Sequence, residues 1–139
     1  MRKKLAPPSS DRPTKHILII DDDLTVIKIL ESRLKANGYH PVIAPEAPAG
    51  LEMAIKNLPD LIILDVMMPI INGYNLCTIL KSEQKTKKIP IIILTGRSEE
   101  VDKTIGQKVG ADAYITKPFL MEQLLGTIKD LLKASDNDI

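Results

Sequence analysis

The chain has few of the residues on which several classes of protein depend. Of its 139 residues, one is cysteine and none is tryptophan, so no disulfide can form within the chain. The cysteine, Cys77, lies in an apolar stretch of helical pattern, which is typical of a buried and unreactive thiol. No apolar run approaches the ~20 residues of a membrane span, and residues 1–15 lack the apolar segment of a signal peptide. We therefore expect a cytoplasmic protein without membrane attachment.

Aromatic residues and net charge are equally low. The aromatic residues are Tyr39, Tyr74, Tyr114 and Phe119, too few for the stacking platform that binds single-stranded nucleic acid. The 19 basic residues are balanced by 18 acidic ones, whereas a dedicated nucleic-acid-binding domain carries a marked basic surplus. We expect this chain alone to bind no specific nucleic acid.

What the chain has instead is a series of short apolar runs separated by helical patterns. The runs are Ile17–Ile20, Pro41–Ala44, Leu61–Leu64, Ile91–Leu94 and Ala113–Thr116. Three of them contain nothing but isoleucine and leucine, which is typical of strands buried on both faces of a parallel sheet. Apolar residues at helical spacing lie between and after them, for example from Met121 to Leu132. This alternation predicts an α/β fold, a single doubly wound (βα)5 domain with a five-stranded parallel sheet.

The predicted domain leaves short polar segments at both ends. Residues 1–15 are basic and proline-rich and indicate a disordered arm; the regular pattern occupies residues 16–133, and residues 134–139 are expected to fray. Local signals mark the helix ends. Asp23 suits the N-cap of the first helix and Gly38 its C-terminal end, while Pro48 suits the first turn of the second. Ser98 is a plausible cap for a fourth helix.

Polar residues follow four of the five runs. They are Asp21-Asp22-Asp23, Asp65, Thr95-Gly96 and Lys117-Pro118-Phe119. In open α/β sheets, ligands bind beyond the carboxyl ends of the strands, so these residues are the candidate site. The second run is followed by no such group, which an edge position in the sheet would explain.

Together these motifs resemble the receiver domain of two-component response regulators. The resemblance rests on Asp21-Asp22, Asp65-Val66-Met67-Met68-Pro69, Asn72-Gly73, Thr95-Gly96 and Lys117-Pro118-Phe119, in this order, and covers His16 to about Lys133. It implies the flavodoxin-like strand order 2-1-3-4-5. It also implies that Asp65 accepts a phosphoryl group and that Lys117 precedes a cis peptide bond.

The resemblance further implies a Mg²⁺ site. Its ligands would be Asp22, Asp65 and the backbone carbonyl of Met67, with Asp21 supporting them from nearby. With the first and third strands adjacent, roughly 5 Å apart, the carboxylates of Asp22 and Asp65 nearly touch. Their repulsion is on the order of 4 kcal/mol at an effective dielectric near 20, and a hard divalent cation would offset it.

Further residues would stabilise the phosphoryl group and transmit the signal. Lys117 would reach back to Asp65 from two strands away, roughly 10 Å, and Thr95 would offer its hydroxyl to a phosphoryl oxygen. In receivers, an aromatic residue at the position of Tyr114 rotates inward as the threonine moves. The readout surface would then be the fourth helix, the fifth strand and the fifth helix.

The lifetime of the phosphorylated state is expected to depend on the flanking residues. Met67 and Arg97 stand where receivers flank the approach of the hydrolytic water. A thioether cannot hold that water in line, and a guanidinium has only donors, so we expect slow spontaneous decay. Gly96 leaves the phosphoryl group open to an external phosphatase or a returning histidine.

Partners and activity follow from the same resemblance. A sensor histidine kinase or a phosphotransfer protein would donate the phosphoryl group, and a protein target would bind the switched surface. The chain would act as a monomer or a weak phosphorylation-dependent dimer, and as a signalling protein rather than an enzyme with a separate substrate. It would be either a stand-alone regulator or a receiver excised from a DNA-binding regulator.

The same residues argue against three other functions. A haloacid-dehalogenase-like phosphatase needs a second aspartate two residues after the nucleophile, where this chain has Met67. A nucleotide-binding domain needs a glycine-rich loop after the first strand, where three aspartates would repel phosphates. A degenerate receiver would act only as an interaction module, yet all the phosphorylation residues are present.

Overall fold

A single parallel sheet forms the centre of the computed structural model, which describes residues 14–65, 73–96 and 110–137. Its strands are β1 (His16–Ile20), β2 (His40–Ala44), β3 (Leu61–Asp65), β4 (Ile91–Thr95) and β5 (Ala113–Thr116). Their order is β2-β1-β3-β4-β5, and every pair is parallel. The predicted strand order and the edge position of the second strand are confirmed.

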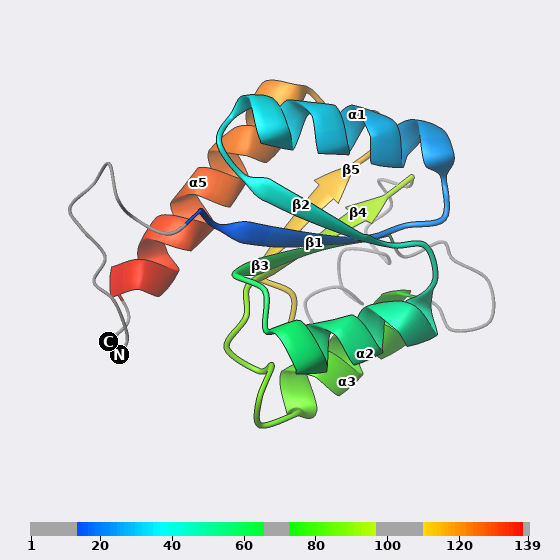
Figure 1. Cartoon of the computed structure of the whole chain (residues 1–139), viewed down its shortest axis with the longest axis vertical. Helices are drawn as coiled ribbons and strands as arrows, with labels where there is room; N and C mark the ends of the chain where they lie inside the picture. Colours follow the sequence, from blue (N-terminus) through cyan, green and yellow to red (C-terminus); the bar gives the residue numbers. More distant parts are fainter. Residues whose placement is uncertain (1–13, 66–72, 97–109, 138–139) are drawn as a thin grey trace.

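Helices cover both faces of the sheet (Figure 1). The described helices are α1 (Leu24–Ala36), α2 (Ala47–Asn57), α3 (Gly73–Ser82) and α5 (Met121–Asn137). α1 and α5 lie on one face, and α2 and α3 lie on the other. Each face has its own cluster of buried apolar side chains. The doubly wound architecture is therefore confirmed, while the predicted fourth helix lies outside the described residues, as does most of the predicted N-terminal arm.

The two central strands are buried along their whole length. Every residue of β3 and of β4 is buried, which agrees with runs that contain no polar alternation. Burial of isoleucine and leucine side chains contributes about 1.5–3 kcal/mol each, so these strands hold the two layers together. The polar exceptions are Asp65 and Thr95, which end β3 and β4 at the same edge of the sheet.

Local signals in the sequence set the helix ends as predicted. The Asp23 carboxylate caps α1 by accepting hydrogen bonds from the backbone N–H groups of Thr25 (2.9 Å) and Val26 (3.4 Å). Gly38 follows α1 with a φ of 86°, a left-handed conformation that glycine adopts without strain. Pro48 lies in the first turn of α2, as predicted.

The last helix is longer than predicted. We expected fraying from residue 134, but α5 continues to Asn137. The added turn carries an ion pair between Lys15 Nζ and Asp136 Oδ1, which are 2.7 Å apart. This contact joins residues far apart in the sequence, so the helical pattern alone could not reveal it.

Gly50 in α2 and the C-cap residue Leu58 determine how this helix lies on the sheet. A Cβ atom on Gly50 would lie 2.6–2.9 Å from three side-chain carbons of Ile20, so the glycine permits a close approach that any other residue would prevent. At the other end, Leu58 caps the helix with a φ of 48°, a strained conformation for a leucine. α2 is therefore tightly seated near Gly50 and ends in a constrained turn.

Ion pairs and hydrogen bonds satisfy the acidic residues at the amino-terminal edge of the sheet. Asp112 Oδ2 accepts hydrogen bonds from the ammonium of Lys81 (2.7 Å) and from the backbone N–H of Ile91 (2.8 Å). Asp60 Oδ2 accepts one from the backbone N–H of His16 (2.8 Å). These bonds tie the starts of β1, β4 and β5 to their neighbours. None of the described helices is long and apolar enough to cross a bilayer.

Candidate functional site

The strand register brings the candidate residues together at the carboxyl edge of the sheet. Ile20 pairs with Leu64, so Asp21 follows its strand at the level where Asp65 ends β3. Thr95 ends β4 beside them, and Lys117 follows β5 directly. Side chains from four segments of the sequence therefore meet where ligands bind in open α/β sheets.

Three carboxylates form the centre of the site. Asp21, Asp22 and Asp65 each offer an oxygen, and these oxygens all lie within 4.8 Å of one another. Asp21 and Asp65 are only 1% and 3% exposed, respectively, whereas Asp22 is exposed. Two buried acids and one solvated acid thus share a small volume at the surface.

The Asp21 carboxylate is only partly satisfied. Its Oδ1 accepts a hydrogen bond from the backbone N–H of Asp23 (2.9 Å), but its buried Oδ2 has no hydrogen-bond partner among the described residues. Burial, together with the negative charge of Asp65, raises the pKa of Asp21 from 3.8 to about 6, against the lowering effect of the Asp23 bond. This carboxylate is held in a place where its charge is unfavourable unless a cation joins it.

A divalent cation fits this arrangement. Hard cations prefer carboxylate oxygens as ligands. An ion with few protein ligands keeps several waters on its exposed side. In this cluster the exposed side is the one where Asp22 lies. The orphaned Asp21 Oδ2 and the mutual repulsion of the acids are both unfavourable features that a cation would remove. The residues present therefore suit a divalent metal site.

Lys117 and Thr95 surround Asp65 on its other side. Lys117 Nζ lies 3.7 Å from Asp65 Oδ1, so the long side chain spans the two strand positions as expected. The Lys117 side chain is 24% exposed and that of Asp65 is 5% exposed, which makes this ion pair less screened than a surface one. The Lys117–Pro118 bond is cis, as the resemblance implies. The backbone N–H of Lys117 donates to the carbonyl of Thr95, which links the two segments directly.

Tyr114 lies behind the site, on β5. It is half-buried, and its hydroxyl lies 3.1 Å from that of Tyr74 on α3. Sequence reasoning did not single out Tyr74. The signal that could have found it is its position near the start of the helical stretch that contains Cys77, which packs on the same face of the sheet as Tyr114.

The residues expected to tune the phosphorylated lifetime are only partly described. Gly96 is exposed, and a Cβ atom there would meet nothing within 4 Å, so the space beside Thr95 is open in the described part of the chain. Met67 and Arg97 lie outside the described residues. Cys77, by contrast, is buried as predicted, and burial raises the pKa of its thiol to about 11.

Fold and site together define a receiver of the two-component type. Residues 17–129 match the response regulator receiver domain family. Because this match covers most of the chain, the protein belongs to that family, and it is a receiver domain of a two-component system. The phosphatase and nucleotide-binding alternatives are thereby excluded.

Individual proteins agree with this assignment. The chain is 43% identical over 118 residues to the response regulator ArlR of Staphylococcus haemolyticus, covering 85% of this chain and 52% of that protein. A crystal structure of a putative response regulator from Chloroflexus aurantiacus has a TM-score of 0.84 and 37% identity, covering 87% of this chain and 99% of that one.

A more distant structure shares the fold alone. The receiver domain of the Pseudomonas aeruginosa sensor histidine kinase PA1611 has a TM-score of 0.81 at 21% identity, covering 87% of this chain and 99% of that one. This chain spans about half the length of the curated relatives that it matches.

Proposed function

We propose that the chain accepts a phosphoryl group on Asp65 from a phosphohistidine of a sensor histidine kinase or phosphotransfer protein. The observation that carries this proposal is the position of Asp65 within a cluster of three carboxylates, with the Lys117 ammonium 3.7 Å away. Acidic groups that repel one another bind the cation that phosphoryl transfer requires. A lysine on the opposite side can neutralise the incoming phosphoryl oxygens.

The transfer needs no general base. A carboxylate oxygen of Asp65 attacks the phosphorus of the phosphohistidine, the P–N bond breaks, and the imidazole leaves with the bonding electron pair and takes up a proton from solvent. The product is an acyl phosphate on Asp65. Lys117 would then face the added negative charge, and the Thr95 hydroxyl at the end of β4 would donate a hydrogen bond to it.

Mg²⁺ is the proposed cation. Asp21, Asp22 and Asp65 would hold it, with the carbonyl of Met67 as a further ligand, and the bound ion would neutralise charge on the transferring group. The likeness to the receiver of PA1611 supports this choice, because that structure has a magnesium ion coordinated in its active-site cleft. Asp21 contributes more than support, since its unpaired Oδ2 points to direct ligation.

A donor must dock beside Asp65, and an apolar groove of about 390 Å³ lies there. It runs between α1 and the segment after β5, with Val26 and Ile29 on one side and Phe119 and Met121 on the other, next to Lys117. Ile29 is 50% exposed although it is a large apolar residue. This groove is suited to the apolar face of a helix that carries the phosphohistidine.

The output is proposed to be a change of binding surface rather than turnover of a separate substrate. Phosphorylation would draw Thr95 toward Asp65 and reorient Tyr114, so that a protein partner, or a further part of a longer regulator, binds the surface around the predicted fourth helix, β5 and α5. Since the donor kinase uses ATP, we expect the protein to act in the cytoplasm, as a monomer or a weak phosphorylation-dependent dimer.

Acetyl phosphate tests the assignment without a kinase. With Mg²⁺ present, the intact mass should rise by one phosphoryl group, and Asp65→Asn should abolish the rise, whereas the exposed Asp130→Asn should not. Asp22→Ala should weaken Mg²⁺ binding and slow the reaction without unfolding the chain. Phosphorylation that persists in Asp65→Asn would show that another residue is the acceptor.

The lifetime of the phosphorylated state is a separate proposal. Because neither Met67 nor Arg97 can position a hydrolytic water as an acceptor, the acyl phosphate should decay slowly until a partner removes it. Met67→Asn or Arg97→Gln should speed decay severalfold when the loss of phosphoryl mass is followed over time. Unchanged decay in both variants would show that these side chains do not set the rate.

A further inference from the structure

A second hollow lies at the opposite end of the molecule from Asp65. It has a volume of about 500 Å³ and opens between the C-terminal half of α2 and the strands β1 and β2. Small-molecule sites in proteins occupy about 300–1,000 Å³ and are mostly apolar with a few polar groups. The size of this pocket falls within that range.

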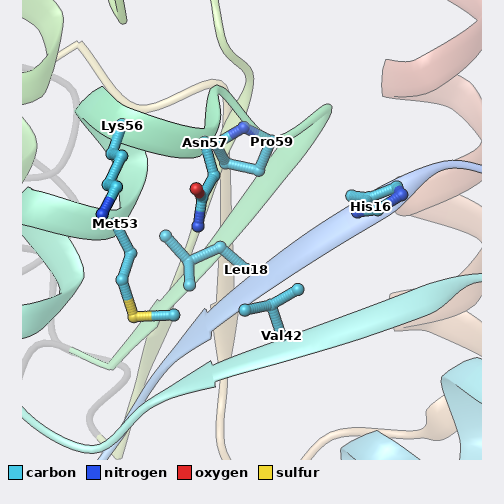
Figure 2. Close-up of a pocket in the computed structure, with 7 residues that line it drawn as sticks. All are labelled: His16, Leu18, Val42, Met53, Lys56, Asn57 and Pro59. Carbon is cyan, nitrogen blue, oxygen red and sulfur yellow. The ribbon is translucent and has the colours of Figure 1, made fainter.

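The floor of the pocket is apolar. Leu18, Val42 and Met53 line it, and Leu18 is only 1% exposed, so the base belongs to the rigid core. Figure 2 shows the Met53 side chain reaching across toward Val42, with Leu18 between the sheet and the helix. A thioether adapts to ligands of different shape and makes favourable contacts with aromatic rings.

The rim carries polar side chains, and two of them have no polar partner among the described residues. Lys56 forms no ion pair with any described residue, not even with Glu52 one turn earlier on α2. The Asn57 amide points toward Leu18 in Figure 2 and forms no hydrogen bond among the described residues. His16 adds an imidazole, which contacts the ring of His40 at a centroid distance of 4.6 Å. None of the described residues that line the pocket is acidic.

The pocket follows from how α2 is seated. Gly50 allows the helix to touch Ile20 near the carboxyl edge of the sheet, whereas the larger Met53 stands between helix and sheet toward the other end. The strained φ of Leu58 then turns the chain sharply back toward Pro59, another lining residue. Strained residues of this kind are often found where a protein shapes a ligand site.

From the apolar floor and the unopposed positive charge at the rim, we propose that this pocket binds a small organic carboxylate with an apolar body. The body would lie on Leu18, Val42 and Met53. Its carboxylate would pair with the Lys56 ammonium and accept a hydrogen bond from the Asn57 amide. The site is separate from the phosphorylation site and does not depend on the function proposed for Asp65.

Three ligands that share one apolar body and differ in charge test the proposal. Phenylbutyrate, phenylbutanamide and phenylbutylamine are titrated into the full chain, and binding is followed by NMR shifts of the Leu18, Val42 and Met53 methyl groups. Phenylbutyrate should saturate these shifts at millimolar concentration, as expected for a ligand of this size. The amide should bind about threefold to fivefold more weakly, the range that an exposed ion pair supplies, and the amine more weakly still.

Two lysine variants separate the pocket from general charge attraction. Lys56→Met should remove the preference for phenylbutyrate over its amide, while Lys28→Met, an exposed lysine on α1 across the sheet, should leave it unchanged. Lack of saturable shifts at the three methyl groups would overturn the proposal. So would equal binding of the acid and the amine, or equal effects of the two lysine substitutions.

Discussion

The two edges of the sheet treat their acidic residues in opposite ways. At the amino-terminal edge, Asp60 and Asp112 accept hydrogen bonds from backbone N–H groups, and Asp112 also pairs with Lys81. At the carboxyl edge, burial and the charge of Asp65 raise the pKa of Asp21, and an oxygen of Asp21 has no partner among the described residues. At the amino-terminal edge the carboxylates join neighbouring strands, and at the carboxyl edge they form an acidic cluster that suits a cation.

The carboxylates at one end of the strands therefore stabilise the fold, and those at the other end destabilise it. A carboxylate that is satisfied by the protein itself adds to the free energy of unfolding. A carboxylate that is buried against another acid subtracts from it until a cation arrives. Substitutions at the two edges should therefore change stability in opposite directions.

The largest effect is expected at Asp112. Asp112→Ala should lower the free energy of unfolding by about 2–3 kcal/mol, because it leaves the Lys81 ammonium and the Ile91 N–H without their charged acceptor. Urea denaturation at neutral pH measures this change. Asp130→Ala, which removes an exposed carboxylate from α5, is the matched control and should change stability by less than about 0.5 kcal/mol. Equal effects of the two substitutions would mean that the Asp112 network adds nothing.

The opposite sign is expected at Asp21. In metal-free protein at pH 7.5, Asp21→Asn should raise the free energy of unfolding by about 1–3 kcal/mol, since the pKa of the native carboxyl is about two units too high. An asparagine oxygen can still accept the Asp23 N–H, and its amide can donate to Asp65. Excess Mg²⁺ should stabilise the parent chain more than the variant. A destabilised variant would show that Asp21 is structural.

The pH dependence gives the same comparison a second test. The pKa of Asp21 is higher in the folded state than the ordinary 3.8, so folding favours the protonated form. The associated stability is fully present below pH 4 and is lost as the pH rises through about 6. The gain in free energy of unfolding from Asp21→Asn should therefore be absent at pH 4 and grow as the pH rises from 4 to 7. An advantage that does not vary with pH would have another cause.

The smallest effect is expected at Tyr74, between the two edges. Tyr74→Phe removes the hydroxyl that lies 3.1 Å from that of Tyr114, and the net loss of one such hydrogen bond is about 1 kcal/mol. Tyr39→Phe, on the α1 and α5 side of the sheet, serves as the control. NMR signals of the Tyr114 ring should move in the first variant alone. If they move equally in both, the hydroxyl pair does not hold Tyr114 in place.

The sequence predicted the strands well because the central ones are buried on both faces. Runs such as Leu61–Leu64 and Ile91–Leu94 have no competing helical pattern, and each observed strand begins and ends within one residue of its run. The residues of the candidate site could be grouped together for a related reason. In a parallel sheet all strand ends of one kind share an edge, so Asp65, Thr95 and Lys117 must lie close together.

Features that depend on distant contacts were not predicted. The extension of α5 involves a contact between Lys15 and Asp136, and the closure of the amino-terminal edge involves one between Lys81 and Asp112. Neither pair has a recognisable spacing. The unpaired oxygen of Asp21 was missed in the same way, because the three consecutive aspartates are equivalent in sequence and only the fold buries one and exposes the next.

The contact between Gly50 and Ile20 has a mechanical consequence. Ile20 immediately precedes Asp21, so the place where α2 presses hardest on the sheet is one residue from the acidic cluster. α2 approaches the sheet closely at Gly50, whereas the longer side chain of Met53 lies between the helix and the sheet nearer the other end. A shift of α2 toward the sheet at Gly50 would therefore press on Ile20, the residue that directly precedes the acidic cluster.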